Sequence, residues 1–560
     1  MKKLQSAFKR LKKTIIVFAI ALSVLFSAAF TGSHFEISKH LDIFATLFRQ
    51  LHVHYVDDVN TASLMKTAID EMLKSLDPYT NFISEDEIED FRFMTTGQYG
   101  GIGALIHNRD DFIVISEPYY DFPAQKAGLF AGDKILEVNG RDIKGMSSAD
   151  VRNLLRGQPG TTVSVLIDRY GKEKNLEIDI VREDVKIDNI PFHTILDNNV
   201  GYIKLAGFTE NAGRETKDIF QNMKATHNIE KIILDLRGNG GGLLNEAVNV
   251  ANIFLDKDLL IVSTKGKLEE RNTRHRTLNT PVDTEMPLVV LIDRGSASAS
   301  EIVAGAIQDY DRGLVIGQRS FGKGLVQNVV PLSYNSRLKV TVAKYYIPSG
   351  RCIQAVNYAE RNEDGSVSRI PDSLKVAFET KGGRTVYDGG GIEPDVFVEP
   401  ERFSKVSASL INNFLIFDFA TKFFFNNDSI LPAGQFEITD PIYKAFLDFI
   451  EDKDFDYETR SERKINELLD IAQEEQYDEL IGQDIEQLRQ SLLSIKEDDL
   501  INFEEEIRFL LQNEIIGRYY YQRGRIKNNL NFDKGLIKAQ EILLDMTQYV
   551  SLLNDTIQKH

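Results

Sequence analysis

The chain of 560 residues contains a single cysteine, Cys352, and no tryptophan. One cysteine cannot form an intramolecular disulfide, which excludes a disulfide-stapled scaffold. A zinc or redox site built on paired cysteines is excluded for the same reason, whereas a metal site made of His, Asp and Glu is not.

Positive charge is also scarce. The 66 Lys and Arg residues stand against 84 Asp and Glu residues, a formal net charge of -18. Proteins bind nucleic-acid backbones through clustered Lys and Arg, whereas an acidic surface on average repels the phosphates. We therefore expect no nucleic-acid partner. At ~100 to 200 residues per domain, the length predicts about three to five folded units.

Residues 1–30 differ from the rest of the chain. Six cations and no acid precede an apolar run from Thr14 to Phe30, which is the pattern of an export signal. The run is a little long for a cleaved signal peptide and a little short for a membrane span of ~20 residues. Cleavage near Ser27 and retention as a membrane tether through residues 14–30 both stay open. Residues 31–95 predict a helical segment, with an apolar face that includes Leu41, Phe44 and Leu47.

Glycine becomes rare after residue 400, since 33 of the 38 glycines precede residue 401. Residues 401–560 contain 18 basic and 31 acidic side chains, a net charge of -13. Apolar residues recur there at helical spacing, as in Phe503, Ile507, Leu510 and Leu511. We predict an acidic helical C-terminal domain whose charged runs are solvated helix faces.

Between residues 96 and 183 the pattern changes to short strands, with one helix at Ser148–Leu155, as in a small β-barrel. The first strand, expected at Ile102–Ile106, is preceded by glycines that allow backbone N–H groups to point into one concavity, a nest suited to a terminal carboxylate. The predicted peptide-binding residues are Tyr99, Gly100, Gly101, Ile102 and Gly103. Together with the turn Pro123–Leu129 and the following segment Ala131–Gly140, they resemble a PDZ domain over about 85 residues. The resemblance implies that the module captures extended C-terminal peptides.

Strands and helices alternate between residues 184 and 400. Three strands run into loops: Lys231–Leu236 into a glycine-rich turn, Pro287–Ile292 into a serine-rich turn, and Leu314–Ile316 into Gly317–Lys323. The first two loops lead into predicted helices, Leu243–Phe254 and Ala299–Asp309. Loops at the carboxyl ends of parallel strands face a common crevice, so we expect these three to meet there.

Other readings of these motifs fail on specific residues. Gly317–Lys323 has the spacing of a phosphate loop, but Gly324 stands where a magnesium-binding Ser or Thr is required. The glycine-rich turn lacks the third glycine of a dinucleotide fingerprint, since Leu243 occupies that position. Ser63-Leu64-Met65-Lys66 matches an S-x-x-K motif without its companion motifs, and His52 and His54 have no acidic partners that would make a metal site.

The serine-rich turn contains Ser296, Ser298 and Ser300, each placed to cap a helix. A serine nucleophile needs a base, and none of the nine histidines lies in these loops. A lysine can serve as the base if burial lowers its pKa from ~10.4 toward neutrality. Ser298 with Lys323 is therefore a candidate pair, and a helix cap is the alternative.

The ordered set of motifs is similar to the carboxyl-terminal processing proteases, also called tail-specific proteases. The shared motifs are the PDZ region, Leu234–Gly242, Ser296–Glu301, Phe321–Gln327 and Tyr345–Arg351. The resemblance covers residues 40–400 and implies a core of crotonase/ClpP-like βα units. It implies Ser298 as nucleophile, Lys323 as base and Gln327 as the residue that orients the lysine, with Asp309 added in some descriptions. An oxyanion hole would combine the N–H of Ala299 with that of Gly240 or Gly241.

The fold expected is thus an α/β protease core with an inserted PDZ β-barrel, an N-terminal helical segment and an α-helical C-terminal domain. The predicted boundaries are 1–30, 31–95, 96–183, 184–400 and 401–560. The predicted function is an exported serine endopeptidase without metal or cofactor, acting on proteins with free, apolar C-termini. It would work in a bacterial cell envelope, either periplasmic or anchored in the inner membrane and facing outward. The motifs assign no role to the helical C-terminal domain, so contact with an oligomer partner or with an adaptor stays open. A non-catalytic envelope scaffold is the alternative.

Overall fold

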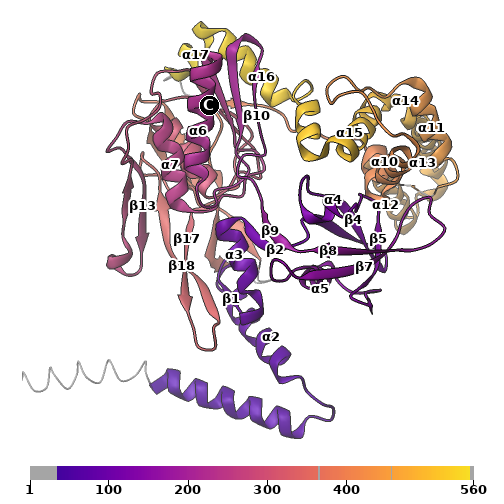
Figure 1. Ribbon diagram of the computed structural model, residues 1–560, viewed down its shortest axis with the longest axis horizontal. Helices are drawn as coiled ribbons and strands as arrows, with labels where there is room; N and C mark the ends of the chain where they lie inside the picture. The colour runs from indigo at the N-terminus through magenta and orange to yellow at the C-terminus, as the bar shows by residue number, and fades with distance from the viewer. Residues whose placement is uncertain (1–34, 363–365, 454, 456, 555–560) are drawn as a thin grey trace, which may run out of the picture. The chain divides into compact units, whose positions relative to one another are not determined.

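The computed structural model describes residues 35–362, 366–453, 455 and 457–554 (Figure 1). The predicted export segment, residues 1–30, lies outside the described residues. The chain divides into two compact units, residues 1–82 and 83–560.

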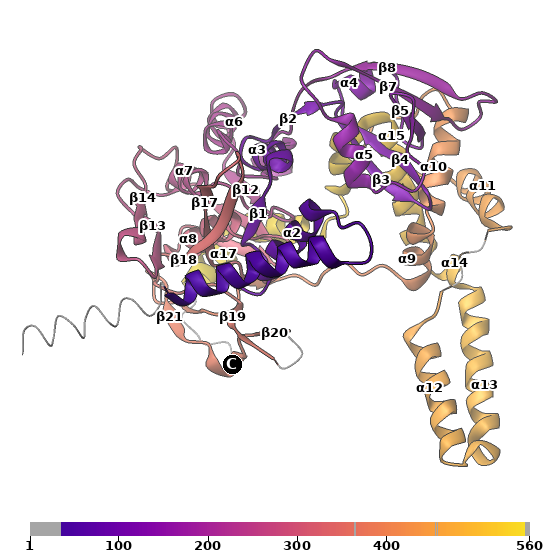
Figure 2. The ribbon, with the colours of Figure 1, turned by 90° about the horizontal axis from the view of Figure 1, so that it is seen from below.

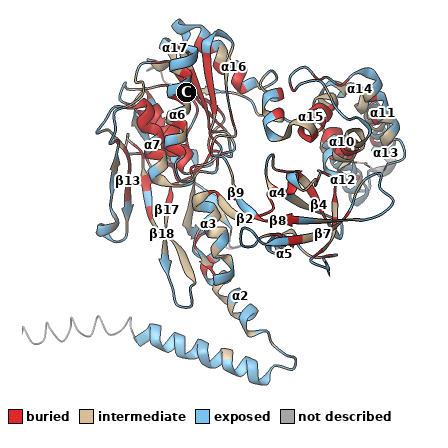
Figure 3. Cartoon of the chain, viewed as in Figure 1, coloured by how far each residue is buried: buried red, intermediate tan, exposed pale blue. Residues whose placement is uncertain are grey.

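The first unit contains a helix over residues 35–54 and helix α2 (Thr61–Lys74). The side chains of Phe35 and Leu41 are exposed, and Figure 3 shows the helix over 35–54 almost entirely pale blue. Ser63 lies in the first turn of α2, where its N–H donates to the side chain of Asn60 at 3.1 Å. Among the described residues, no helix is both long and apolar enough to cross a bilayer.

The PDZ region follows the helix α3 (Ile88–Thr96). Its main sheet is antiparallel in the order β3-β4-β5-β7-β8, and a separate pair joins β2 to β9. The helix α5 spans Ser148–Leu155, as predicted. The predicted strand Ile102–Ile106 is wrong in its bounds, because Gly103 has a φ of +71° and breaks the strand there. The elements of this region are β2 (Gln98–Gly101), β3 (Ala104–Arg109), β4 (Phe112–Pro118), α4 (Pro123–Lys126), β5 (Lys134–Val138), β6 (Arg141–Asp142), β7 (Thr162–Asp168), β8 (Leu176–Val181) and β9 (Glu183–Lys186).

The α/β core is a sheet in the order β10-β11-β12-β15-β16-β23. The strands β11, β12, β15, β16 and β23 are parallel, and β10 is an antiparallel edge. The predicted parallel strands are confirmed, so the loops that follow β12, β15 and β16 leave the sheet at one end. The strands are β10 (Phe192–Leu196), β11 (Val200–Lys204), β12 (Lys231–Asp235), β15 (Leu288–Ile292), β16 (Leu314–Gly317) and β23 (Val396–Phe397).

Helices cover both faces of this sheet. Successive strand side chains point to opposite faces, so Leu234 and Val290 pack with the helices α6 (Ala212–His227), α7 (Leu244–Phe254) and α8 (Ala299–Asp309). Ile233 and Val289 pack instead with α16 (Lys534–Leu544) and α17 (Met546–Leu553). Figure 3 shows the deep burial of α7.

A second, antiparallel sheet lies beside the core. Strand β18 (Arg337–Tyr346) pairs with β17 (Leu325–Pro331) and with β13 (Leu260–Gly266), which pairs with β14 (Arg274–Arg276). The connection from β18 to β23 carries two short hairpins, β19 (Val356–Arg361) with β20 (Val367–Arg369), and β21 (Ala377–Glu379) with β22 (Thr385–Tyr387). Strand β17 of this sheet begins at Leu325, two residues after Lys323.

The C-terminal region is helical, as predicted, and contributes to two cores. The helices α9 (Lys405–Asn412), α10 (Leu415–Asn426), α11 (Asp440–Ile450) and α15 (Glu504–Asn529) share one apolar cluster. The helices α12 (Arg460–Glu474) and α13 (Asp478–Glu497) form a projecting pair with a small core of its own (Figure 2), and α14 (Asp499–Asn502) leads into α15. The last two helices, α16 and α17, belong to the core of the α/β sheet.

Helix α10 also touches the PDZ region. The guanidinium of Arg109 bonds both carboxylate oxygens of Asp418 at 2.5 and 2.6 Å. The ring of His107 stacks on Phe414 with centroids 4.8 Å apart. These contacts attach the β3-β4 edge of the PDZ region to the helical domain.

Candidate active site

Ser298 lies at the start of α8, in the turn that follows β15. Its backbone has φ +56° and ψ -112°, a combination that costs free energy for a residue with a Cβ. The strain persists because the turn is held on both sides: Ala297 N–H donates to Asn239 O at 3.0 Å, and Ile302 N–H donates to Ser298 O at 3.0 Å. Such strain is concentrated at functional sites in proteins.

The three serines of this turn have different environments. The hydroxyl of Ser296 donates to Leu236 O at 2.8 Å, and that of Ser300 donates to Asn239 O at 2.8 Å. Both residues are fully buried, whereas Ser298 is half-buried. Ser296 and Ser300 therefore tie the turn to the glycine-rich loop, and Ser298 is the serine of the three that solvent reaches.

The glycine-rich turn packs directly against Ser298. A Cβ on Gly241 would lie 2.8 Å from Ser298 Cβ and 2.9 Å from Ala299 N, so this close approach requires glycine. The N–H of Gly241 is taken by Asn239 Oδ1 at 2.9 Å. Gly240 is exposed, with open space beside it. As the first residue of α8, Ala299 has an N–H that no carbonyl of its own helix can accept.

Glu301 joins the serine loop to the lysine loop. Its Oε2 accepts from Ser298 N–H at 2.8 Å and from Lys323 N–H at 2.9 Å. Its Oε1 accepts from the hydroxyl of Ser320 at 2.5 Å and from Gly322 N–H at 2.8 Å. The fully buried carboxylate thus fixes the backbones of the predicted nucleophile and base to each other.

The lysine loop is packed tightly around its glycines. Gly322 has φ +89°, and a Cβ there would lie 2.3 Å from Ala355 Cβ. The hydroxyl of Tyr345 lies within hydrogen-bond distance of Lys323 O and, at 3.2 Å, of Ser298 O. Gln327, on β17 beyond a bulge, donates to Thr341 Oγ1 at 3.3 Å. The structure therefore brings the serine, lysine and glycine loops together, as expected for the ends of parallel strands.

Asp309 lies at the opposite end of α8 from Ser298, about 16 Å away at 1.5 Å per residue. Its carboxylate bonds the buried guanidinium of Arg351 at 2.8 Å and accepts from Ser349 N–H at 2.9 Å. These contacts anchor the segment after β18 to the helix. Asp309 therefore has a structural role, and its side chain lies far from Ser298.

Glu301 and Tyr345 were not among the predicted site residues. Both lie within the motifs that carried the resemblance, Ser296–Glu301 and Tyr345–Arg351. One feature of the sequence does point to Glu301: it lies three residues after Ser298. At that spacing a carboxylate can accept a hydrogen bond from the N–H of the N-cap residue. That spacing predicts a helix cap, and nothing in it indicates the contacts with residues 320–323.

The buried position of Glu301 predicts a pH-dependent stability. Burial raises the pKa of Glu301 to about 7, while bonds from Ser320, Lys323, Ser298 and Gly322 act in the opposite direction. Between the ordinary glutamate pKa and about 7, the folded protein holds a proton that the unfolded chain has released, so stability falls as pH rises through this window and is constant above it. The difference in unfolding free energy between wild type and Glu301→Gln should shrink by roughly 2 to 3 kcal/mol from pH 5 to pH 7. Urea unfolding at pH 5, 6, 7 and 8 measures it, and a pH-independent difference would contradict the prediction.

The PDZ region contains a cavity of about 220 Å³ between β3 and α5. Apolar residues make most of its wall, and the cation of Arg152 stands at its edge. The wall is formed by Phe93, Tyr99, Ile102, Ala104, Leu105, Ile106, Tyr119, Arg152, Leu155 and Arg156. Of the predicted nest, Gly103 has a left-handed φ and Gly101 does not. Elsewhere among the described residues, no cluster of His, Cys, Asp and Glu is placed to hold a metal ion.

Comparisons with known proteins define the class. Three family models match: Peptidase family S41 at residues 199–360, a PDZ domain at 114–169, and the C-terminal helical domain of probable PDZ-proteases at 406–543. The chain belongs to the carboxy-terminal-processing proteases of peptidase family S41 and is a serine-type peptidase with a PDZ domain.

Individual relatives agree with this assignment. The chain is 36% identical to a carboxy-terminal-processing protease of Bartonella bacilliformis over 61% of this chain and 79% of that protein. It is 34% identical to a probable CtpA-like serine protease of Staphylococcus aureus over 61% of this chain and 68% of that protein. Among solved structures, a photosystem II D1 C-terminal processing protease is 29% identical over 64% of this chain and 87% of that one, with a TM-score of 0.36.

Proposed function

We propose that this peptidase is an endopeptidase that uses Ser298 as nucleophile and Lys323 as general base. The observation that carries the proposal is the four-bond junction at Glu301, which fixes the serine and lysine loops beside an open glycine turn. Ser296 and Ser300 donate their hydroxyls to the glycine loop, whereas Ser298 is half-buried at the N-cap of α8, where substrate can reach it.

The proposed reaction is acyl transfer. Neutral Lys323 takes the proton of the Ser298 hydroxyl, and the oxygen attacks the peptide carbonyl to give a tetrahedral oxyanion. The N–H groups of Ala299 and Gly240 stabilise this oxyanion, and one such donor contributes about 3 to 4 kcal/mol. The lysine returns the proton to the leaving amine, the C–N bond breaks, and water then hydrolyses the acyl-enzyme. Gln327 beside the base loop would orient Lys323.

A covalent trap tests the nucleophile. A fluorophosphonate should label the protein once, with fluoride as the leaving group, and peptide mass spectrometry should locate the adduct at Ser298. The same experiment distinguishes a serine peptidase from the alternative, a non-catalytic PDZ scaffold. Absence of labelling in a folded, full-length preparation would favour the scaffold.

The PDZ cavity supports a second part of the proposal, that substrates are selected by their free C-terminal tails. Its walls from Phe93, Leu105 and Leu155 suit an apolar terminal side chain. A terminal carboxylate would accept hydrogen bonds from the backbone N–H groups of the turn at Gly103. We expect a substrate that ends in an amide to be cleaved at least tenfold less well, measured as kcat/KM, than the same peptide with a free acid, because charge-assisted hydrogen bonds worth ~1.5 to 3 kcal/mol are lost. Equal cleavage of the two peptides would remove the tail-reading role.

Two glycine variants provide a matched test of the nest. Gly103 and Gly145 both have positive φ, +71° and +74°, so alanine is strained at either. A Cβ on Gly103 would lie 2.6 Å from Phe122 Cβ, whereas Gly145 has open space. Gly103→Ala should raise KM for the free-acid peptide and Gly145→Ala should not. A substrate too short to reach the PDZ region should be insensitive to both.

We further propose export by residues 1–30, so that the enzyme works in the bacterial cell envelope, with cleavage or anchoring by residues 14–30 as alternatives. The proposed domain division remains 1–30, 31–95, 96–183, 184–400 and 401–560. The crotonase/ClpP-like relationship of the core is part of the same proposal. An oligomer or adaptor role of the helical domain stays a prediction.

A further inference from the structure

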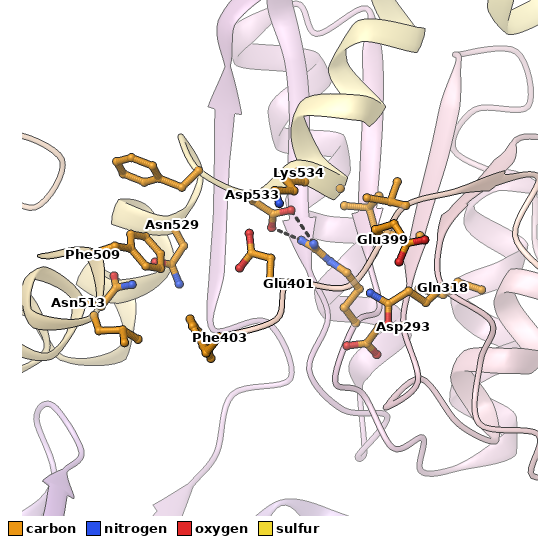
Figure 4. Close-up of a pocket in the computed structure, with 18 residues that line it drawn as sticks. Asp293, Gln318, Glu399, Glu401, Phe403, Phe509, Asn513, Asn529, Asp533 and Lys534 are labelled. Carbon is orange, nitrogen blue, oxygen red and sulfur yellow. Dashed lines mark hydrogen bonds and ion pairs between the residues drawn. The ribbon is translucent and has the colours of Figure 1, made fainter. Parts of the chain in front are cut away.

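Arg237, which opens the glycine turn, lies between two carboxylates from distant parts of the chain. Its guanidinium bonds Asp235 through Nε at 2.9 Å and Nη2 at 2.7 Å. It also bonds both oxygens of Asp533, through Nη1 at 2.7 Å and Nη2 at 2.6 Å. Asp533 and Arg237 both line a cavity of about 350 Å³ between the end of the α/β sheet and the helical domain, and Figure 4 labels Asp533 there and marks its bonds with dashed lines. Asp533 thus connects the helical domain to the glycine turn.

Two further groups bond Asp235. Asp235 is fully buried and also receives the hydroxyl of Tyr202 at 2.7 Å and the ammonium of Lys204 at 3.4 Å. Burial alone would raise the pKa of Asp235, but the cations Arg237 and Lys204 outweigh it and hold that pKa below its ordinary value. Within this hydrogen-bonded network Asp235 and Asp533 face Arg237 and Lys204, so loss of the Asp533 charge removes one of the two carboxylates that bond the guanidinium.

The network fixes the backbone as well as the side chains. Arg237 N–H donates to Asp235 Oδ1 at 2.9 Å, and the ammonium of Lys204 reaches Arg237 O at 3.4 Å. The next residue, Gly238, donates its N–H to Asp293 Oδ1 at 2.8 Å. Only Asn239 then separates this anchored segment from Gly240, whose N–H is a proposed oxyanion donor.

We propose that Asp533 of the helical domain is a positioning residue for hydrolysis, acting through Arg237 on the glycine turn beside Ser298. The proposal rests on the serine chemistry proposed above. It assigns to the C-terminal region a part in building the active site, in addition to its contacts with the PDZ region.

The test is Asp533→Asn, with Asp545→Asn as its matched control. Asp533 caps α16 by accepting from Leu536 N–H at 2.9 Å, and Asp545 caps α17 by accepting from Thr547 and Gln548 N–H at 3.0 Å. Asparagine caps helices about as well as aspartate, so both variants keep their caps. Asp533→Asn alone loses the charge that faces Arg237.

The assay uses the full chain and a short peptide that does not reach the PDZ region. We expect Asp533→Asn to lower kcat 10- to 100-fold with KM within twofold of wild type, and to slow fluorophosphonate labelling of Ser298 in parallel. Asp545→Asn should keep kcat within twofold, and Asp533→Glu should recover part of the loss because a carboxylate again reaches the guanidinium.

Equal kcat in Asp533→Asn and Asp545→Asn would overturn the proposal, and so would a change confined to KM. Thermal unfolding sets an assay temperature at which both variants are folded. Should Asp533→Asn be too unstable, Arg237→Lys provides a second test. Lysine keeps the positive charge but lacks the planar guanidinium that bonds both carboxylates, so kcat should fall to the same extent. If the wild type itself has no hydrolysis that depends on Ser298, the proposed function fails first, and the two failures are thereby distinguished.

Discussion

Replacement of Lys323 by arginine should abolish peptide hydrolysis, with a loss of at least about 10⁴-fold in kcat. An arginine keeps the positive charge but cannot release its proton at any usable pH, so it cannot act as a base. Lys323→Ala and Ser298→Ala should fail to the same extent. Steady-state cleavage of a short peptide measures the loss, and circular dichroism shows whether each variant is folded.

Two neighbouring serines are the matched controls for Ser298. Ser296→Ala and Ser300→Ala each remove a buried hydroxyl bond to the glycine loop, so we expect lower melting temperatures but kcat within about tenfold of wild type. Near wild-type turnover in Lys323→Ala would show that the dyad is assigned to the wrong residue. Loss of activity in EDTA that zinc restores would point to metal chemistry instead.

Removal of the Glu301 carboxylate should have the next largest effect. Glu301→Ala leaves the N–H groups of Ser298, Gly322 and Lys323 without their acceptor, and each buried donor that loses its partner costs ~1 to 3 kcal/mol. The serine and lysine loops would separate, so we expect kcat to fall at least about 100-fold. Glu301→Gln should fall less, because one of its two terminal atoms still accepts hydrogen bonds.

Glu246 provides the control for Glu301. Both are the third residue of their helices, α7 and α8, and both accept a backbone N–H: Gly213 donates to Glu246 at 2.7 Å. Glu246→Ala should cost stability with little change in kcat. If Glu301→Ala and Glu246→Ala lose stability alike and both keep kcat, Glu301 is a structural cap and nothing more.

The sequence predicted the fold well where local patterns decide it. The strands of the α/β core are almost continuous apolar runs, as expected for strands buried on both faces, and α5 and α8 have the predicted bounds. The error at Ile102–Ile106 has a local cause: Gly103 adopts a left-handed φ, which interrupts a strand that its neighbours favour. Composition alone could not show that the acidic helical region supplies α16 and α17 to the second face of the sheet.

Sequence motifs and sheet topology predicted only part of the candidate site. Parallel strands bring the three loops to one end of the sheet, and this placed Ser298 and Lys323 in neighbouring loops. The bonds of Glu301 and Tyr345 cross between those loops, so no spacing along the chain reveals them. The same is true of Arg237 and Asp533, which are 296 residues apart.

The covering of the α/β sheet by α16 and α17 has a consequence for biosynthesis. These helices begin more than 200 residues after the last residue of β16, yet Leu536, Ile542 and Leu543 are fully buried against the sheet. Until the ribosome has made them, one apolar face of the sheet has no partner and Arg237 lacks Asp533. The α/β core therefore lacks part of its apolar packing until this last segment has been translated.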